Sequence, residues 1–444
     1  MKALSAKEKW SYGLGALGQN MIYGLVSTFL MVFYTDEFGI DAAVVGTLFL
    51  IARIWDAVLD PVVAVWIDRI NTRWGKFRPF VLLGGSIVSL LTVLCFYAPA
   101  FSMPMKIVYI CVTYMLWNTA YSLFDVPYWS LAPTLTNDTA ERTKIIAFPK
   151  ILGAVGIIIA SAAVSPMVKA LGGGEDARGY LWTALIFALM CTLLIILMFR
   201  NTQERFAAAS TERKSLKDSM NVVTRNKPLL IVTLASFFAS TPLVLKNTMT
   251  VYYLKYNVGD EGLLPLFLLS GMGLMLVAMG ITPKIAAKQG KKRTFMIGGL
   301  ISILANAAFY FVQPEQTALV FAVNAISMLG IGFILVLVTS MQADTIEYAE
   351  WKTGKRSESI VTSVGTFNAK LCSAIAGALA GYGLSLSGYV ADAAQTNSVL
   401  DGIQLMMSLL PAAGLVLCVA SISFYGLSER KYEEIKESLN ARKK

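Results

Sequence analysis

Histidine is absent from this chain of 444 residues, and charged residues make up only 15% of it. The lack of histidine excludes imidazole metal sites and proton relays through imidazole, so carboxylates must carry any cation or proton chemistry. The five cysteines all lie in apolar runs and form no Cys-x-x-Cys pair, which argues against a disulfide framework or a zinc site. A soluble globular protein is about one-quarter charged, so the composition points to another class of protein.

Long apolar runs fill most of the chain, because 56% of its residues are hydrophobic. A helix needs about 20 apolar residues to cross a bilayer, and these runs are too long and continuous for barrel strands. The pattern predicts an all-α integral membrane protein with twelve transmembrane helices. The expected spans are 11–34, 42–67, 79–100, 106–132, 146–170, 179–200, 227–256, 262–283, 294–313, 317–341, 362–388 and 401–427.

The net charge of +10 reflects membrane topology rather than a nucleic-acid partner. Most of the 38 Lys and Arg residues fall at the termini and in alternate loops, whereas intervening loops such as TDEFGID are neutral or acidic. This positive-inside pattern predicts cytoplasmic N- and C-termini. The first apolar run is long and lacks a small-residue cleavage site, so we expect a retained helix and no cleaved signal peptide.

The spans divide into two halves that carry a faint internal repeat. The loop RWGKFRPF and the loop KQGKKRTF share Gly, Lys, Arg and Phe at an offset of 215 residues, and each follows the second span of its half. Parallel halves with a site near the midplane are a transporter architecture. We expect a bundle with the cation site at 1–200, a cytoplasmic linker at 201–226, a second bundle at 227–428 and a basic cytoplasmic tail at 429–444.

Three carboxylates interrupt apolar runs of the first half. Asp56 and Asp60 share one helix face, and they repel each other unless a cation lies between them or one is protonated. Asp125 stands two residues before Pro127. Hard cations prefer oxygen ligands, so these carboxylates and Ser122 would form a plausible cage. Carboxylates inside a membrane are functional candidates by default.

Cations also occur at depth, so a purely structural ion pair is the alternative for these aspartates. Arg53 or Lys150 could pair with Asp56 or Asp60. Lys150 and Lys370 could instead bind sugar hydroxyls or a substrate carboxylate, or pair with the aspartates. For Lys246 and Lys255 we expect the side chain to snorkel to a membrane surface.

A tryptophan beside a carboxylate suits a sugar, because the ring stacks on apolar C–H groups while the carboxylate accepts hydroxyl protons. Trp129 follows Asp125 by four residues and shares its helix face. Packing or interfacial anchoring is the alternative for Trp129. Gln19 and Asn20 are polar groups on a glycine-rich first span, where helix packing is the alternative to a binding role.

Five motifs resemble the glycoside–pentoside–hexuronide:cation symporters, a branch of the major facilitator superfamily that includes the melibiose permeases. The resemblance covers essentially the full length and implies two six-helix bundles around a central cavity, with alternating access. The motifs are FYTDEFGI, VGTLFLIARIWDAVLDP, NTRWGKFRPF, YSLFDVPYWSL and ADTIEYAEWKTGKRSES.

By position, the resemblance implies roles for individual residues. The cation site would comprise Asp56, Asp60, Ser122 and Asp125, with the three aspartates as metal ligands if the ion is Na⁺ and Arg53 as a charged neighbour. The substrate site would comprise Gln19, Asn20, Asp125, Trp129, Lys150, Thr366 and Lys370. The cytoplasmic gate would comprise Asp344, Glu347, Glu350 and Arg356; from the charges alone, these last four could equally form a solvated helix end.

The site also departs from the melibiose permeases, which have Lys-Asp where this chain has Gln19-Asn20. Relatives that carry glucuronides or pentosides match Asn20 better, yet tend to have Asn at the position of Asp125. Loss of an acid with retention of Lys150 and Lys370 would favour an anionic hexuronide.

The predicted function is cation-coupled symport of a sugar or glycoside, with Na⁺ or H⁺, by a monomer in a bacterial inner membrane and without a cofactor. The first alternative is a proton symporter for hexuronides or pentosides. A lipid transporter or a non-transporting sensor on the same fold is more remote. An enzyme is not expected, because nucleophile–base pairs and metal motifs are missing from the sequence. The sequence decides neither the sugar, the ion nor the stoichiometry.

Overall fold

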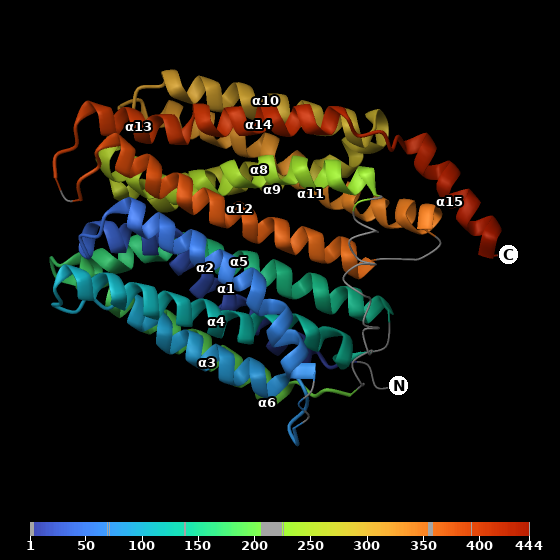
Figure 1. Cartoon of the computed structure of the whole chain (residues 1–444), viewed down its shortest axis with the longest axis horizontal. Helices are drawn as coiled ribbons and strands as arrows, with labels where there is room; N and C mark the ends of the chain where they lie inside the picture. The colour runs from blue at the N-terminus through green and yellow to red at the C-terminus, as the bar shows by residue number, and fades with distance from the viewer. Residues whose placement is uncertain are drawn as a thin grey trace. The chain divides into compact units, whose positions relative to one another are not determined.

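The computed structural model describes residues 4–68, 70, 72–136, 139–205, 224, 226–353, 358–391 and 393–443. Within these ranges, twelve helical segments are long and apolar enough to cross a membrane, which confirms the predicted fold class (Figure 1). The helices are α1 Ala6–Val32, α2 Ala42–Asp68, α3 Arg78–Cys95, α4 Met103–Leu135, α5 Thr139–Gly172, α6 Asp176–Asn201, α8 Lys227–Tyr252, α9 Leu264–Gln289, α10 Lys291–Phe311, α11 Thr317–Thr353, α12 Glu358–Ser387, α13 Asn397–Met407, α14 Leu409–Ser423 and α15 Glu429–Lys443, with short turns η1 Phe33–Glu37, η2 Tyr253–Val258 and η3 Glu261–Leu263.

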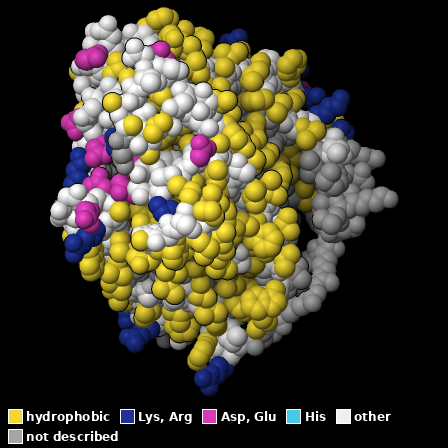
Figure 2. Space-filling model, turned by 60° about the vertical axis from the view of Figure 1, so that its left-hand side comes forward, with side chains coloured by type: hydrophobic (Ala, Val, Ile, Leu, Met, Phe, Trp, Pro, Cys, Tyr) yellow, Lys and Arg dark blue, Asp and Glu magenta, His cyan; other side chains and the backbone are white. Residues whose placement is uncertain are grey.

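Large apolar side chains remain on the outside of the protein, as a lipid environment requires. Leu90, Val112 and Leu193 are among those more than half exposed. In Figure 2, hydrophobic side chains dominate the visible face and charged side chains are few. The exposed surface is therefore suited to acyl chains rather than water.

The helices form two compact units. The first contains α1 to α6, and the second contains α8 to α15. Two short segments from later in the chain, Glu261–Pro265 and Tyr389–Ala394, also belong to the first unit. They are joined to it by an ion pair of Glu261 with Lys169 at 3.1 Å and by a hydrogen bond from the Tyr389 hydroxyl to Asp36.

Close packing of α1 on α5 positions the polar residues of the first span. At Gly156 of α5, a Cβ atom would lie 2.5 Å from the carbonyl oxygen of Leu17. At Gly153, it would lie 2.7 Å from Nδ2 of Asn20. Glycine therefore allows the two backbones to approach more closely than any other residue would.

The first helix of each unit ends in a π-helical turn. The turn η1 follows α1 directly, and η2 follows α8 directly. A glycine with positive φ comes soon after each turn, Gly39 at 71° and Gly259 at 79°. The first unit and the second unit thus share an irregular feature that hydropathy does not predict.

The segment after the last span is helical and packed rather than a loose tail. Helix α15 places Ile435 and Leu439 in a core cluster with Leu337 and Met341 of α11. The predicted linker 201–226 lies mainly outside the described residues. We call the end of each unit that carries most of its Lys and Arg residues the basic end.

Candidate substrate and cation site

Asp56 is buried on α2 and forms an ion pair. Nη1 of Arg53 lies 3.3 Å from its Oδ2, and the two side chains are 12% and 4% exposed, respectively. The guanidinium also lies 5.9 Å from the ring centroid of Tyr23 on α1. The structural pairing that the sequence left open is thus present at Asp56. Asp60 stands one helical turn further, with its Oδ1 shielded from solvent.

Asp125 on α4 holds two site residues through one oxygen. Its Oδ1 accepts a hydrogen bond from Nε2 of Gln19 at 2.7 Å and another from Nε1 of Trp129 at 3.0 Å. The shared helix face that spacing predicted for Asp125 and Trp129 is therefore confirmed. Because the indole N–H is bound, the tryptophan ring is held in one orientation, as a stacking platform requires.

Two pairs of tyrosines join α1 to α4, the helices that carry Gln19 and Asp125, and sequence reasoning missed them. Tyr12 and Tyr128 stack with ring centroids 4.8 Å apart, and each hydroxyl donates to the other's backbone carbonyl at 2.8 Å and 2.6 Å. Tyr23 and Tyr121 approach to 5.6 Å between centroids. The only sequence signal for these pairs is that the tyrosines lie at similar depths on the first and fourth spans. This signal is weak, because aromatic residues are common in apolar runs.

The remaining predicted residues of the first unit differ in exposure. Ser122 is buried on α4, one turn before Asp125. Asn20 donates from Nδ2 to the carbonyl of Ala16 at 2.9 Å, so its amide is bound to its own helix. Lys150 is exposed on α5, and in the described part of the chain it forms no ion pair. Pairing of Lys150 with Asp56 or Asp60 is therefore not observed.

Among the described residues, no group of three or more His, Cys, Asp or Glu side chains converges as a metal site. Asp56 is engaged by Arg53, and Asp125 is engaged by Gln19 and Trp129. Their joint role as cation ligands stays a prediction.

Lys246 corrects the expectation of snorkelling. Its side chain on α8 is only 3% exposed, and Nζ donates to Oδ1 of Asn306 on α10 at 2.9 Å. The amide of Asn306 donates in turn to Oγ of Ser327 on α11 at 2.8 Å. Nζ also lies 5.3 Å from the ring centroid of Phe309. The lysine is therefore a buried amine, and its contacts through Asn306 link three helices of the second unit.

The other predicted residues of the second unit are on α11 and α12. Thr366 is exposed and Lys370 is half-buried on α12. Asp344 on α11 forms an ion pair with Lys291 at the start of α10, inside the same unit. Half-buried side chains at 347 and 350 follow on α11, and Arg356 lies outside the described residues.

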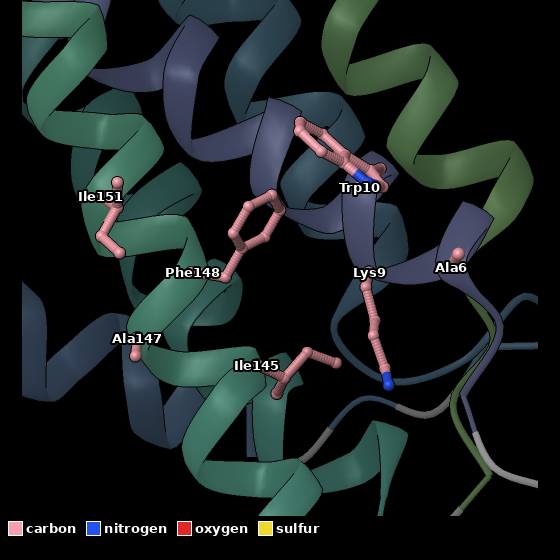
Figure 3. Close-up of a pocket in the computed structure, with 7 residues that line it drawn as sticks. All are labelled: Ala6, Lys9, Trp10, Ile145, Ala147, Phe148 and Ile151. Carbon is pink, nitrogen blue, oxygen red and sulfur yellow. The ribbon is translucent and has the colours of Figure 1, made fainter.

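A separate cavity of about 390 Å³ lies between the start of α1 and α5 (Figure 3). Trp10 and Phe148 meet edge to face in its wall, with ring centroids 4.8 Å apart, and Lys9 is the one charged residue among the described residues that line it. None of the predicted site residues lines this cavity. A sugar needs several convergent polar groups, so the cavity is unsuited to one.

Two helical units with twelve spans, and buried or half-buried aspartates within those spans, are typical of a secondary transporter of the major facilitator type. A family model described as MFS/sugar transport protein matches residues 11–429. The chain belongs to this family.

Relatives and solved structures agree with this assignment. An isoprimeverose transporter of Lactiplantibacillus pentosus is 37% identical over 94% of this chain and 88% of its own length. A glucuronide carrier protein homolog of Escherichia coli (strain K12) is 31% identical over 98% and 95%. A putative glycoside/cation symporter, YagG, of the same strain is 30% identical over 99% and 96%. The solved nucleoside transporter NupG shares the fold with a TM-score of 0.68 at 15% identity, covering 94% of this chain and 98% of that one.

Proposed function

We propose that this protein couples the entry of a small glycoside to a cation, by alternating access, with both termini in the cytoplasm of a bacterium and the protein in its inner membrane. The observation that carries the proposal is the Asp125 carboxylate, which holds Gln19 and Trp129 through one oxygen. A fixed tryptophan face beside a carboxylate fits the alternating C–H and O–H surface of a sugar ring.

Sugar binding would use the first unit's polar residues in distinct ways. A carboxylate can accept about four hydrogen bonds, so we assign Asp125 to substrate hydroxyls in addition to Gln19 and Trp129. Gln19 is 1% exposed, and its Oε1 accepts no hydrogen bond from any described residue. This acceptor would bind a sugar hydroxyl. We assign Asn20 and Lys150 of the first unit, and Thr366 and Lys370 of the second unit, to supporting contacts.

Cation binding would use Asp56, Asp60, Ser122 and Asp125. Arg53 lies 3.3 Å from Asp56, so a cation bound among the aspartates would share that carboxylate with the guanidinium. A cation that fixes the position of the Asp125 carboxylate would also fix the Trp129 indole that this carboxylate binds. Each ligand would then raise the affinity of the protein for the other by the same factor. Asp344, Glu347, Glu350 and Arg356 would contribute to gating at the cytoplasmic side.

The names of two relatives support two classes of substrate, a neutral glycoside and an anionic hexuronide. Isoprimeverose transport in one relative favours a neutral glycoside, and the glucuronide carrier homolog favours an anionic hexuronide. The exposed ammonium of Lys150 and the half-buried Lys370 would suit the anion. We place the neutral glycoside first, because Asp125 would repel a carboxylate.

Uptake into proteoliposomes tests the proposal. Isoprimeverose, β-xylosides, galactosides and glucuronides would be offered with an imposed Na⁺ gradient and, separately, with a pH gradient. Na⁺-driven uptake assigns the aspartates to a metal-type site, and uptake driven only by pH assigns them to proton binding. Absence of uptake for every sugar under both gradients would contradict the proposal.

A further inference from the structure

A glutamate beyond the last helix of the first unit binds the start of its third helix. Glu204 stands three residues after α6, and its carboxylate accepts the backbone N–H groups of Lys76 at 2.8 Å, Phe77 at 2.8 Å and Arg78 at 2.9 Å. Helix α3 begins at Arg78, and its N-cap Phe77 provides no side-chain cap. The first amides of a helix have no partner within it, and the helix dipole favours a negative charge there.

The second unit repeats this arrangement. Glu429, the first residue of α15, accepts the backbone N–H of Lys291 at 2.5 Å. Helix α10 begins at Lys291, and its N-cap Gly290 has no side chain to cap it. The sequences are also parallel, because Glu204 and Glu429 are each followed by arginine and lie 225 residues apart.

A glycine without a side chain leaves room for each carboxylate. Gly75 and Gly290 have positive φ angles of 110° and 88°. A Cβ atom on Gly75 would come within 2.5 Å of Oε1 of Glu204, and one on Gly290 within 3.0 Å of Oε1 of Glu429. These glycines are the ones that the two repeated loops share, so the repeat has a structural reason.

Further contacts bind the same segments to neighbouring helix ends. In the first unit, Arg205 pairs with Glu8 of α1 at 2.5 Å, and its backbone N–H donates to the carbonyl of Thr134 of α4 at 3.0 Å. In the second unit, Nζ of Lys292 donates to the carbonyl of Ser423 at the end of α14 at 2.6 Å. Helix ends from different parts of the sequence are thus fastened together at the basic end of each unit.

We propose that the two carboxylates are a matched pair of clamps, Glu204 on the start of α3 and Glu429 on the start of α10, that make the basic end of each unit move as one body during transport. The link to transport rests on the proposed function. Without its clamp, the start of α3 or α10 would not move together with the rest of its unit when the protein changes state. The rate of conversion between states would fall, while the sugar site would keep its shape.

Hydrogen–deuterium exchange on the purified full-length protein tests the clamps without any substrate. Glu204→Gln retains the shape and removes the charge, and we expect the amides of 76–78 to exchange about tenfold faster, because hydrogen bonds to charged groups are the strong ones. Glu429→Gln should do the same at 291. The controls are Glu175→Gln, an exposed N-cap of α6 without a side-chain bond, and Glu434→Gln, whose partner Arg430 is exposed.

The glycines provide a second, independent route. Gly75→Ala should speed exchange at 76–78 as Glu204→Gln does, and the double variant should show little further change, because both remove one interaction. Unchanged exchange in both Glu204→Gln and Gly75→Ala, relative to Glu175→Gln, overturns the clamp whatever the protein transports.

Uptake then tests the role in movement, with the sugar found in the proteoliposome panel. We expect the maximal uptake rate of each clamp variant to fall about fivefold or more, with the dissociation constant for the sugar within about twofold of the original. Faster exchange with an unchanged uptake rate would overturn the role in movement. If no sugar is transported, the proposed function fails, and the exchange data still decide whether the clamps exist.

Discussion

At the Asp125 carboxylate, a single oxygen accepts the Gln19 amide at 2.7 Å and the Trp129 indole at 3.0 Å. Both bonds are strongest when the carboxylate is ionised, since a charged acceptor roughly doubles the strength of a hydrogen bond. Any change in its charge would therefore loosen both partners at once. The charge of Asp125 therefore affects the orientation of the Trp129 ring.

Replacement of Trp129 by alanine should weaken sugar binding about tenfold, or about 1.4 kcal/mol, with a smaller effect on cation binding. Trp129→Phe retains a ring but deletes the N–H that Asp125 accepts, so its loss should be intermediate. Equilibrium sugar binding and cation titration measure the two effects. Trp182→Ala, an exposed tryptophan on α6, is the control. Equal loss of sugar and cation affinity in Trp129→Ala would indicate a packing role instead.

Asp60→Asn should abolish accumulation driven by the cation gradient, to an internal-to-external sugar ratio of about 1, and leave downhill exchange measurable. The reason is that the amide cannot supply the charge that the cation compensates. Asp56→Asn should do the same and should also release Arg53. Gradient-driven uptake and counterflow in proteoliposomes separate the two activities, with Asp176→Asn at the start of α6 as control. Undiminished accumulation in both variants would refute the cation role.

Lys246→Met should leave thermal stability unchanged or raise it, because an apolar isostere removes the cost of a buried charge. Asn306→Leu should lower stability by about 1–3 kcal/mol, since the buried Lys246 amine would lose its acceptor at 2.9 Å. Thermal unfolding in detergent compares the two variants. A larger loss for Lys246→Met than for Asn306→Leu would show that the charge itself is required.

Sequence reasoning located Asp56, Asp125 and Trp129, because a charge or an indole in an apolar run is conspicuous. It could not find the Tyr12–Tyr128 pair, which resembles ordinary packing in the sequence. It also assigned Lys246 to the membrane surface, because hydropathy does not indicate which side of a helix faces a polar partner such as Asn306.

At the scale of elements, helices α1 and α5 meet so closely that glycine decides their separation. The carbonyl of Leu17 occupies the space that a side chain at Gly156 would need. Since Gln19 and Asn20 lie within a turn of this contact, the geometry of the site depends on the helix pair rather than on the polar residues alone.

Gly156→Ala should therefore push α1 away from α5, lower stability by about 1–3 kcal/mol and weaken sugar binding. The control is Gly273→Ala in α9, where no atom lies within 4 Å of the added Cβ. That variant should be neutral or more stable by about 0.5–1 kcal/mol, because alanine favours a helix. Unfolding in denaturant and sugar binding measure both. Similar behaviour of the two variants would contradict the close-packing argument.

At the scale of the whole molecule, the length of the apolar runs predicted the twelve spans well. The ends were less predictable, because polar helical turns continue beyond the apolar runs. Helix α11 runs on to Thr353, twelve residues past its expected end, and the last span is divided at Ser408 into α13 and α14. Tertiary contacts and capping, which hydropathy does not report, determine those ends.

The π-helical turns η1 and η2 give both units the same irregularity with charges of opposite sign. Each closes the first helix of its unit, yet one carries Asp36 and the other Lys255. A π turn holds more residues than an α turn, so each turn widens the helix at its end. The same local backbone geometry therefore accommodates either sign of charge.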